Sequence, residues 1–522
     1  MPTGNTVNPP PGDRRGRPAA RVAAGILVTR ILGLVRERVF AHYFGSGREA
    51  DAFRAALRIP NIIRNLLGEG TLSASFIPVY ASMLQREERE AARRLSSIVA
   101  SLLVIVAIIG SVLGAVLAPV VTSVVAPGFG AATRSLTIGL VRILFPMAGV
   151  MILSAWCLGV LNTHRRFFLS YAAPTLWNIA QIATLLTFGT WVAGWRGTEL
   201  ITALAWGALV GSVLQVLVQL PTAVRMAGAL RWALQLQAQG VQTVFRAWLP
   251  VVFGAGVWQI SSVIDTQLGS FTGGGGVAFL AYAQLLAILP VSLFGVSIAA
   301  AALPELSRDA AVESAQATRD RLADGARRIA FFVIPSAFVF AALGSHVVAA
   351  LYQTGSFDAT QTEVVTGVLA AYSIGIPAQA SVRLLTSGHY ALGDTRTPVR
   401  VAGLTVVLAA VLAVVFMRFW GVAGIALGSA TAAYVNLLLN YVYLERRTGS
   451  IIGQVERSSI VLTLGASLMA TGAALLAGRL VPSDQILLGA VVALGTFALV
   501  YLVVTILMRH PDARSLLPIG GE

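Results

Sequence analysis

The chain has 522 residues, of which 56% are hydrophobic and 12% are charged. Soluble globular domains carry charge on about a quarter of their residues, so the composition excludes a soluble protein and indicates an integral membrane protein. The net charge of +15 does not indicate nucleic-acid binding, because the arginines are spread over many short segments and are not gathered on one soluble domain.

Hydrophobic stretches long enough to cross a bilayer recur along the whole chain. A helix needs about twenty residues to span roughly 30 Å of hydrocarbon. Fourteen spans are expected, at 19–45, 50–82, 95–126, 135–161, 169–193, 198–224, 248–272, 276–304, 329–352, 362–390, 398–418, 421–444, 458–479 and 484–508. Only helices or closed barrels satisfy the backbone in lipid, and stretches of this length without period-2 alternation exclude a barrel. The sequence therefore predicts an all-α polytopic membrane protein.

Arginines are unequally distributed between the two sides of these spans. With the amino terminus placed in the cytoplasm, the cytoplasmic segments hold 25 arginines and the opposite loops hold five. Cytoplasmic loops of membrane proteins carry an excess of positive charge, so the distribution predicts an even number of spans with both termini cytoplasmic. The first eighteen residues lack the apolar core of a secretory signal and are expected to form a disordered cytoplasmic tail.

Two halves of the chain share a proline pattern. Pro60 and Pro78 in the second span correspond to Pro290 and Pro304 in the eighth, and each pair precedes a charged loop. Apolar segments can resemble each other by composition alone, but repeats of six spans are typical of transporters with a cavity between two parallel bundles. The expected domains are a tail at 1–18, an N-lobe at 19–224, a cytoplasmic linker at 225–247, a C-lobe at 248–446, two accessory spans at 455–508 and a cytoplasmic tail at 509–522.

The first two spans contain charged residues that a lipid-facing helix would not tolerate. They are Arg30, Arg36, Glu37, Arg38, Asp51, Arg54, Arg58, Arg64 and Glu69. One arginine at mid-bilayer costs about 2.5–3.5 kcal/mol on insertion scales, so these side chains must face protein or a polar cavity. On a helical wheel the second span has one polar stripe, formed by Asp51, Arg54, Arg58, Asn61, Asn65 and Glu69.

Two interpretations of this cluster remain open from the residues alone. Structural ion pairs would neutralise about half of the positive charge, because three acids accompany six arginines. The surplus favours a cavity that binds an anion. Guanidinium groups bind phosphate through paired hydrogen bonds and stay charged at physiological pH, so a lipid phosphate or pyrophosphate is the expected ligand.

The same residues resemble the MurJ (MviN) lipid II flippases of the MOP exporter superfamily. The resemblance rests on the segment from Thr29 to Glu37, on Asp51-Ala52-Phe53, Pro60-Asn61, Arg64, Glu69-Gly70 and Phe76-Ile77-Pro78-Val79, and continues through Ala173-Pro174, Asn178, Leu289-Pro290 and the segment from Tyr390 to Pro398. It covers the chain to about residue 510. It implies fourteen spans in two lobes around a cationic cavity. It also implies transport, without enzymatic catalysis, of an undecaprenyl-pyrophosphate-linked peptidoglycan precursor between the leaflets of the bacterial inner membrane.

The resemblance also implies roles for individual residues. It places essential cavity arginines at Arg30, Arg36 and Arg64, and supporting acids at Asp51 and Glu69. The polar stripe adds Arg58 and Asn61 as candidate substrate-binding residues.

This sequence departs from the family at one cavity position. The family has a further arginine in the eighth span, where this chain has Leu285. Either Arg142 or Arg383, the other mid-span arginines, supplies that charge, or the substrate is a variant one.

One acid stands alone in the seventh span. Asp265 resembles the sodium-site acid of some family members, but the eleventh span contributes no acid to complete such a site. Sodium or proton coupling at Asp265, a structural partnership with a nearby arginine, and use of the membrane potential all remain open. No cofactor and no metal site are expected, because the five histidines show no metal-ligand spacing.

Other functions remain to be weighed against a lipid II flippase. A flippase for another polyprenyl-linked saccharide is favoured by Leu285. A drug antiporter of the same superfamily would carry acids in the amino-terminal cavity, and a membrane glycosyltransferase would need a catalytic acid beside a metal-binding cluster. The expected partners are the lipid-linked precursor, the membrane and cell-wall synthesis proteins, but no nucleic acid.

Overall fold

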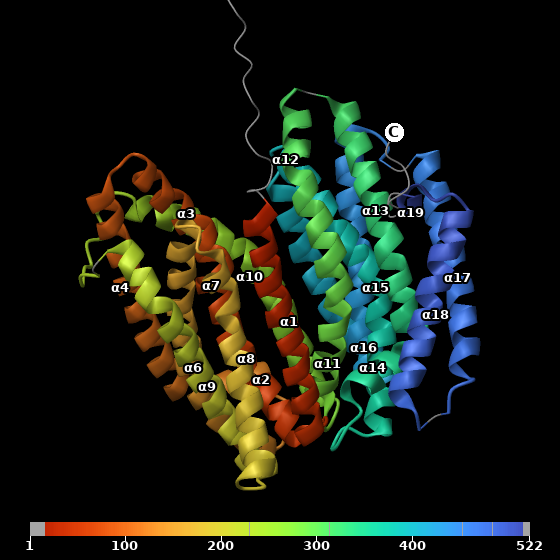
Figure 1. Cartoon of the computed structure of the whole chain (residues 1–522), viewed down its shortest axis with the longest axis horizontal. Coiled ribbons are helices and arrows are strands. Elements are labelled where there is room, and N and C mark those ends of the chain that lie inside the picture. Colours follow the sequence, from red (N-terminus) through yellow and green to blue (C-terminus); the bar gives the residue numbers. More distant parts are fainter. Residues whose placement is uncertain (1–15, 229, 313, 452, 483, 515–522) are drawn as a thin grey trace, which may run out of the picture. The chain divides into compact units, whose positions relative to one another are not determined.

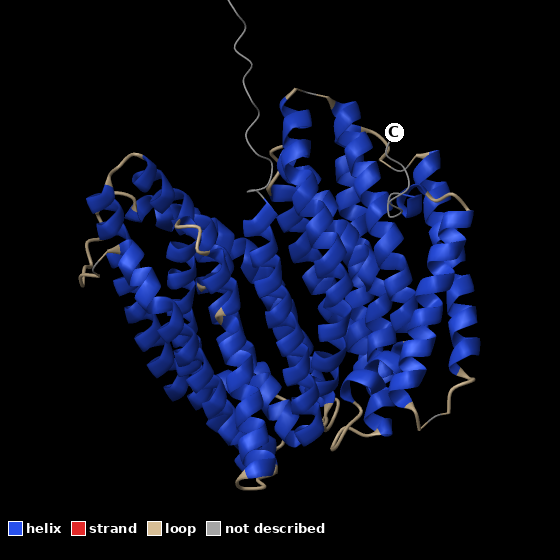
Figure 2. Ribbon diagram, viewed as in Figure 1, coloured by secondary structure: helices blue, strands red, loops and turns tan. Residues whose placement is uncertain are grey.

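The computed structural model describes residues 16–228, 230–312, 314–451, 453–482 and 484–514. These residues form helices joined by short loops, and none of them belongs to a strand (Figure 2). The predicted all-α fold is therefore confirmed. Most of the tail predicted at 1–18, and the end of the tail predicted at 509–522, lie outside the described residues.

The contacts divide the chain into two compact units. The first unit comprises Met1–Phe40, Ile59–Pro119 and Gly139–Phe253, and the second comprises Ala41–Arg58, Val120–Ile138 and Gly254–Glu522. Five helices, α1, α2, α5, α6 and α10, therefore contribute residues to both units. The polar stripe of the second predicted span is split in the same way, because the division falls between Arg58 and Ile59.

The first unit is built from the amino-terminal helices (Figure 1). Its elements are most of α1 (Gly16–Phe44), the end of α2 (Arg48–Leu67), α3 (Glu69–Gln85), α4 (Arg89–Val116), most of α6 (Ala131–Thr163), α7 (Phe167–Ala172), α8 (Pro174–Leu186), the π-helical turn η1 (Thr187–Trp191), α9 (Gly197–Ala227) and the start of α10 (Val241–Phe271). Phe76 and Tyr80 of α3 stack with ring centroids 5.0 Å apart and pack against Leu95 of α4 and Trp156 of α6. Close packing of these large rings contributes van der Waals contacts to the interior of the unit.

Buried polar side chains join α6 to α9 inside this unit. The hydroxyl of Ser154 donates to Gln219 Oε1 at 2.7 Å, and it accepts a hydrogen bond from Gln215 Nε2 at 2.8 Å. All three residues are buried. Membrane helices use such interhelical hydrogen bonds to fix their packing, because lipid offers no other partner to a polar group.

The second unit contains the remaining helices. Its elements are the parts of α1, α2, α6 and α10 that the first unit lacks, with most of α5 (Ala118–Val125), α11 (Gly276–Pro290), the π-helical turn η2 (Val291–Val296), α12 (Ser297–Ala311), α13 (Ala315–Ala342), α14 (Gly344–Tyr352), α15 (Ala359–Ala391), α16 (Arg396–Thr448), α17 (Gln454–Gly478), α18 (Ile486–Leu507) and α19 (Pro511–Arg514). The predicted accessory spans correspond to α17 and α18, which pack on each other and on α13. Tyr501 of α18 donates its hydroxyl hydrogen to the carbonyl of Phe331 at 2.6 Å.

Helix α16 bends sharply and consists of two arms. Trp420 and Gly421 leave the helical conformation, and Gly421 has a φ of 53° and a ψ of −130°. A side chain at Gly421 would be strained in this conformation. The bend lies between the spans predicted at 398–418 and 421–444. Gly428 allows the arms to approach, because an added Cβ would lie 2.5 Å from the backbone nitrogen of Ala413.

Nine of the described helices are long and apolar enough to cross a membrane. The bent helix α16 is counted once among these nine, although it has two arms. This number fits a multi-pass membrane protein. The exact count of fourteen spans remains a prediction, since helices with internal charges, such as α1 and α2, do not satisfy a criterion based on length and hydropathy.

Candidate functional site

The predicted site residues are distributed over the two units. The first unit holds Arg30, Arg36, Asn61 and Arg64, and the second holds Asp51, Arg58 and Asp265. The side chain of Glu69, at the start of α3, lies outside the part of the chain that the structure describes. Of the stripe residues among these candidates, Asp51 and Arg58 thus belong to the second unit and Asn61 to the first.

The guanidinium of Arg36 is held by three neighbours in the first unit. Its Nη2 pairs with Glu37 Oε1 at 2.5 Å, and its Nη1 donates to Asn178 Oδ1 at 3.1 Å. The Arg36 guanidinium carbon lies 4.7 Å from the centroid of the Trp177 ring. Charge-assisted hydrogen bonds and cation–π contact orient a guanidinium strongly. Arg36 remains 17% exposed, so it is oriented but not enclosed.

The same asparagine ties α8 to α1 at a second point. Asn178 Nδ2 donates to the carbonyl oxygen of Thr29 at 3.4 Å, and Thr29 Oγ1 donates to the carbonyl of Tyr171 at 3.0 Å. The contribution of Trp177 and Asn178 to the site was not predicted from the sequence. The only signal was Asn178 itself, which appeared as part of a family motif without an assigned role.

The other site residues of the first unit differ in their surroundings. Arg64 Nη1 lies 3.6 Å from the sulfur of Met151, a weak acceptor. Arg30 is exposed on α1. The side-chain oxygen of Asn61 is buried, and no donor among the described residues reaches it. Such an unsatisfied buried acceptor is unusual in a folded protein and marks a position where a ligand could donate a hydrogen bond.

Asp51 caps another helix in the second unit. Its Oδ2 accepts a hydrogen bond from the backbone N–H of Gly275 at 2.6 Å, and its Oδ1 accepts one from Ala278 at 2.8 Å. The side chain is 3% exposed. The first N–H groups of a helix have no partner within the helix, and a carboxylate satisfies them while facing the positive end of the helix dipole. The observed contacts of Asp51 thus attach the start of α2 to the start of α11.

Arg58 and Asp265 belong to one polar cluster in the second unit. Arg58 Nε donates to Thr266 Oγ1 at 2.7 Å, and Asp265 Oδ1 accepts a hydrogen bond from Ser429 at 3.4 Å. The opposite charges of Arg58 and Asp265 attract each other, and both charges also interact electrostatically with Tyr372 of α15. Two candidates that the sequence placed in different roles, substrate binding and ion coupling, are therefore neighbours.

The arginine expected in the eighth span has no equivalent on α11. Leu285 is a partly buried residue of this helix. The two proposed substitutes, Arg142 on α6 and Arg383 on α15, are both exposed, the first in the first unit and the second in the second. Within the described chain, no group of three or more His, Cys, Asp or Glu side chains is placed to hold a metal ion.

Comparison with known proteins places this arrangement in one family. The profile of the family described as "Lipid II flippase MurJ" matches residues 40–497. The lipid II flippase MurJ of Burkholderia cenocepacia is 33% identical over 82% of this chain and 83% of its own length. The probable lipid II flippase MurJ of Vibrio cholerae is 29% identical over 85% of this chain and 86% of its own length.

Solved structures agree with these relatives at the level of the fold. A lipid II flippase MurJ in an inward closed conformation superposes with a TM-score of 0.78 at 23% identity, covering 94% of this chain and 99% of that one. An inward-facing multidrug MATE transporter of the MOP superfamily superposes with a TM-score of 0.68 at 15% identity, covering 83% of this chain and 98% of that one. The chain therefore belongs to the lipid II flippase MurJ family.

Proposed function

We propose that this protein is a flippase for lipid II, which it moves from the inner to the outer leaflet of the bacterial inner membrane. Lipid II is an undecaprenyl-pyrophosphate-linked peptidoglycan precursor, and its pyrophosphate is the part that a cationic membrane site can recognise. The family, the all-α fold and the arginines in membrane helices support this function together.

The observation that carries the proposal is the orientation of Arg36. Glu37, Asn178 and Trp177 fix its guanidinium from different directions, and the side chain remains partly accessible. A preorganised donor loses little conformational entropy on binding an anion. Arg30 and Arg64 lie in the same unit and would supply further positive charge for the two phosphates.

Transport would follow an alternating-access cycle. The arginines hold the pyrophosphate while the polyprenyl tail stays in the bilayer, and rearrangement of the lobes then exposes the head group on the other side. The membrane potential can drive such a step, since one elementary charge crossing the membrane is worth about 2.3 kcal/mol per 100 mV. Binding and release of the substrate are the only chemistry required, so no catalytic residue is proposed.

Asp265 is better suited to be the counter-ion of Arg58 than a sodium or proton site. The positive charge of Arg58 already acts on this carboxylate, and Ser429 donates a hydrogen bond to it; an opposite charge and a hydrogen bond together offset the cost of burying a carboxylate. The membrane potential is therefore the proposed source of energy. Both termini are proposed to be cytoplasmic, and proteins of the cell-wall synthesis machinery are proposed partners.

The function can be tested with a bacterium depleted of its own flippase. Arg36→Ala or Arg64→Ala should abolish growth of the depleted strain while the protein still inserts into the membrane. Arg457→Ala is the matched control, because this arginine is exposed at the start of α17 and lies outside the proposed site. Normal growth with either site variant would refute the assignment of these arginines to the substrate.

A second candidate is a flippase for another polyprenyl-linked saccharide, and the presence of Leu285 on α11 favours it. Native mass spectrometry of the purified protein separates the two candidates. Lipid II among the co-purifying lipids supports the first, whereas a different polyprenyl pyrophosphate supports the second.

A further inference from the structure

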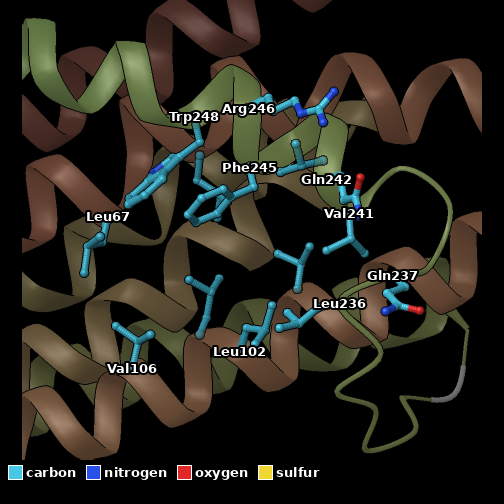
Figure 3. A pocket seen from close by; sticks show the side chains of 14 residues that line it. Leu67, Leu102, Val106, Leu236, Gln237, Val241, Gln242, Phe245, Arg246 and Trp248 are labelled. Atoms are coloured by element: carbon cyan, nitrogen blue, oxygen red, sulfur yellow. The ribbon is translucent and has the colours of Figure 1, made fainter.

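A groove of about 600 Å³ lies in the first unit between α4 and the start of α10 (Figure 3). Val99, Leu102 and Val106 line it from α4, and Phe245 and Trp248 line it from α10. Residues three or four positions apart lie on one face of a helix, so the groove follows one face of α4 over about two turns, roughly 10 Å.

The two ends of the groove differ in polarity. Figure 3 shows Leu67 and Trp248 toward one end and Gln237 and Gln242 toward the other. Arg246 follows Gln242 by one helical turn on α10 and also lines the groove, and the lining contains no acid. The groove therefore fits an amphipathic molecule with an apolar chain and a polar or anionic head.

The surroundings of the groove are those of a bilayer surface. Helix α4 is a membrane span by length and hydropathy. The segment before α10 lies along α4, since Arg231 and Ala233 donate their backbone N–H groups to Ser97 and Ser101 at 3.4 and 3.2 Å. In that segment the side chains of Trp232 and Leu236 are 65% and 59% exposed. Exposed tryptophan and leucine beside arginine are typical of the interface between head groups and hydrocarbon.

We propose that this groove binds one acyl chain of an anionic glycerophospholipid, with the lipid phosphate beside Arg246 and Gln242. Water beside the apolar lining would lack hydrogen-bond partners, whereas an acyl chain makes dispersion contacts along it. A 150 Å³ apolar cavity holds a benzene molecule, so about 600 Å³ offers room for most of one acyl chain by simple proportion.

The direction of the polarity favours a phospholipid over the tail of the transported substrate. Leu67 follows Arg64 by about one turn on α2 and lies at the apolar end of the groove. A polyprenyl chain that started from a pyrophosphate at Arg64 would enter at this apolar end and leave Gln237, Gln242 and Arg246 beside hydrocarbon. A phospholipid inserted from the opposite end satisfies these polar groups. The inference is independent of the proposed transport function.

The test is native mass spectrometry of the delipidated full-length protein in detergent, titrated with palmitoyl-oleoyl phosphatidylglycerol or phosphatidylcholine. We expect one tightly bound lipid per protein and an affinity for phosphatidylglycerol about fivefold higher than for phosphatidylcholine. One arginine near an anionic lipid head group changes the affinity by about this factor. Arg246→Gln should abolish this preference and leave chain binding in place. Leu102→Trp fills the groove and should remove the tight site, and Val106→Trp repeats this test nearer the apolar end in case the first variant does not fold.

Two control variants match these substitutions. Val491→Trp adds a tryptophan at an exposed position of α18, and Arg457→Gln removes an exposed arginine from α17; both should bind lipid like the unchanged protein. Equal affinity of the unchanged protein for the two lipids would overturn the proposal, as would a tight site that survives both tryptophan substitutions in the groove. Displacement of phosphatidylglycerol from the unchanged protein by a polyprenyl pyrophosphate, together with weaker binding of that polyprenyl pyrophosphate to Leu102→Trp, would show that the groove holds the substrate tail and would also overturn it.

Discussion

The carboxylate of Asp51, near the start of α2, accepts a hydrogen bond from the backbone N–H of Ala278, in the first turn of α11, at 2.8 Å. The two residues are 227 positions apart in the sequence. The other carboxylate oxygen accepts from Gly275, whose φ of 93° is accessible mainly to glycine. Two predicted spans from different halves of the chain are thus joined by one buried side chain.

Asp51→Ala should destabilise the protein by about 2–6 kcal/mol, because it leaves two buried N–H groups without acceptors at about 1–3 kcal/mol each. Asp51→Asn keeps one acceptor oxygen and should cost less. Thermal unfolding in detergent, followed by size-exclusion chromatography, measures both. Glu49→Ala removes an acid that pairs with the exposed Arg48 and should cost below about 1 kcal/mol. Equal stability of Asp51→Ala and Glu49→Ala would show that the cap is not important for stability.

Asn178→Ala should weaken binding of lipid II about fivefold to tenfold. One hydrogen bond to a charged group contributes about 1.5 kcal/mol, and the contribution should be slightly smaller here because Arg36 is partly exposed. Trp177→Leu should weaken it by a smaller factor, whereas Trp177→Phe keeps an aromatic face for Arg36 and should restore most of the affinity. Titration of the purified variants with lipid II measures the dissociation constants.

The rescue by phenylalanine separates positioning from general destabilisation. Ile179→Ala, at a 45% exposed position of α8, is the control and should leave the affinity unchanged. Loss of affinity in Ile179→Ala as large as that in Asn178→Ala would contradict a specific role for the contacts around Arg36.

Asp265→Ala should destabilise the protein by about 3 kcal/mol, because it leaves the charge of Arg58 without its counter-ion. Replacing both residues, as Arg58→Met with Asp265→Leu, should recover most of this stability, because removal of both charges leaves neither of them buried without a partner. Thermal unfolding of Arg58→Met, Asp265→Leu and the double variant measures the coupling. Additive losses would show that the two side chains do not interact.

The cluster of Arg58 and Asp265 also predicts how the unfolding temperature of the unchanged protein depends on sodium. If Arg58 is the cation that neutralises Asp265, exchange of sodium for choline should not shift the unfolding temperature. Arg58→Gln removes that cation and should make the unfolding temperature depend on sodium. A sodium-dependent shift in the unchanged protein would instead support ion coupling at Asp265.

Asp394, in the loop before α16, should contribute stability that depends on pH. Its Oδ1 accepts hydrogen bonds from the backbone N–H groups of Thr397 at 3.0 Å and Arg396 at 3.1 Å, and these bonds, Thr397 first, hold the pKa of Asp394 below its ordinary value of 3.8. A carboxyl group whose pKa is lowered by folding stabilises the folded state above the ordinary pKa and loses that contribution as the pH falls through the lowered one.

The stability difference between the unchanged protein and Asp394→Asn should therefore be constant from about pH 5 to pH 8 and shrink below about pH 4. Unfolding by denaturant across this range measures it. Asp320→Asn, at an exposed ion pair with Arg319, serves as the control and should differ little from the unchanged protein at neutral pH. A difference for Asp394→Asn that persists undiminished at low pH would contradict the lowered pKa.

The sequence by itself determined the membrane class, the all-α fold and the family, because hydrophobic length and arginine placement are properties of local segments. It also singled out Arg36, Asp51, Arg58 and Asp265, since charge within an apolar stretch is visible without any structure. The contacts of these residues were decided only by the tertiary structure. Asp51 meets α11, Arg58 meets Thr266 next to Asp265, and Arg36 meets Trp177 and Asn178, each across more than 140 positions. A helical wheel gives the direction of a side chain from its own axis, but the packing of distant helices determines which partner lies in that direction.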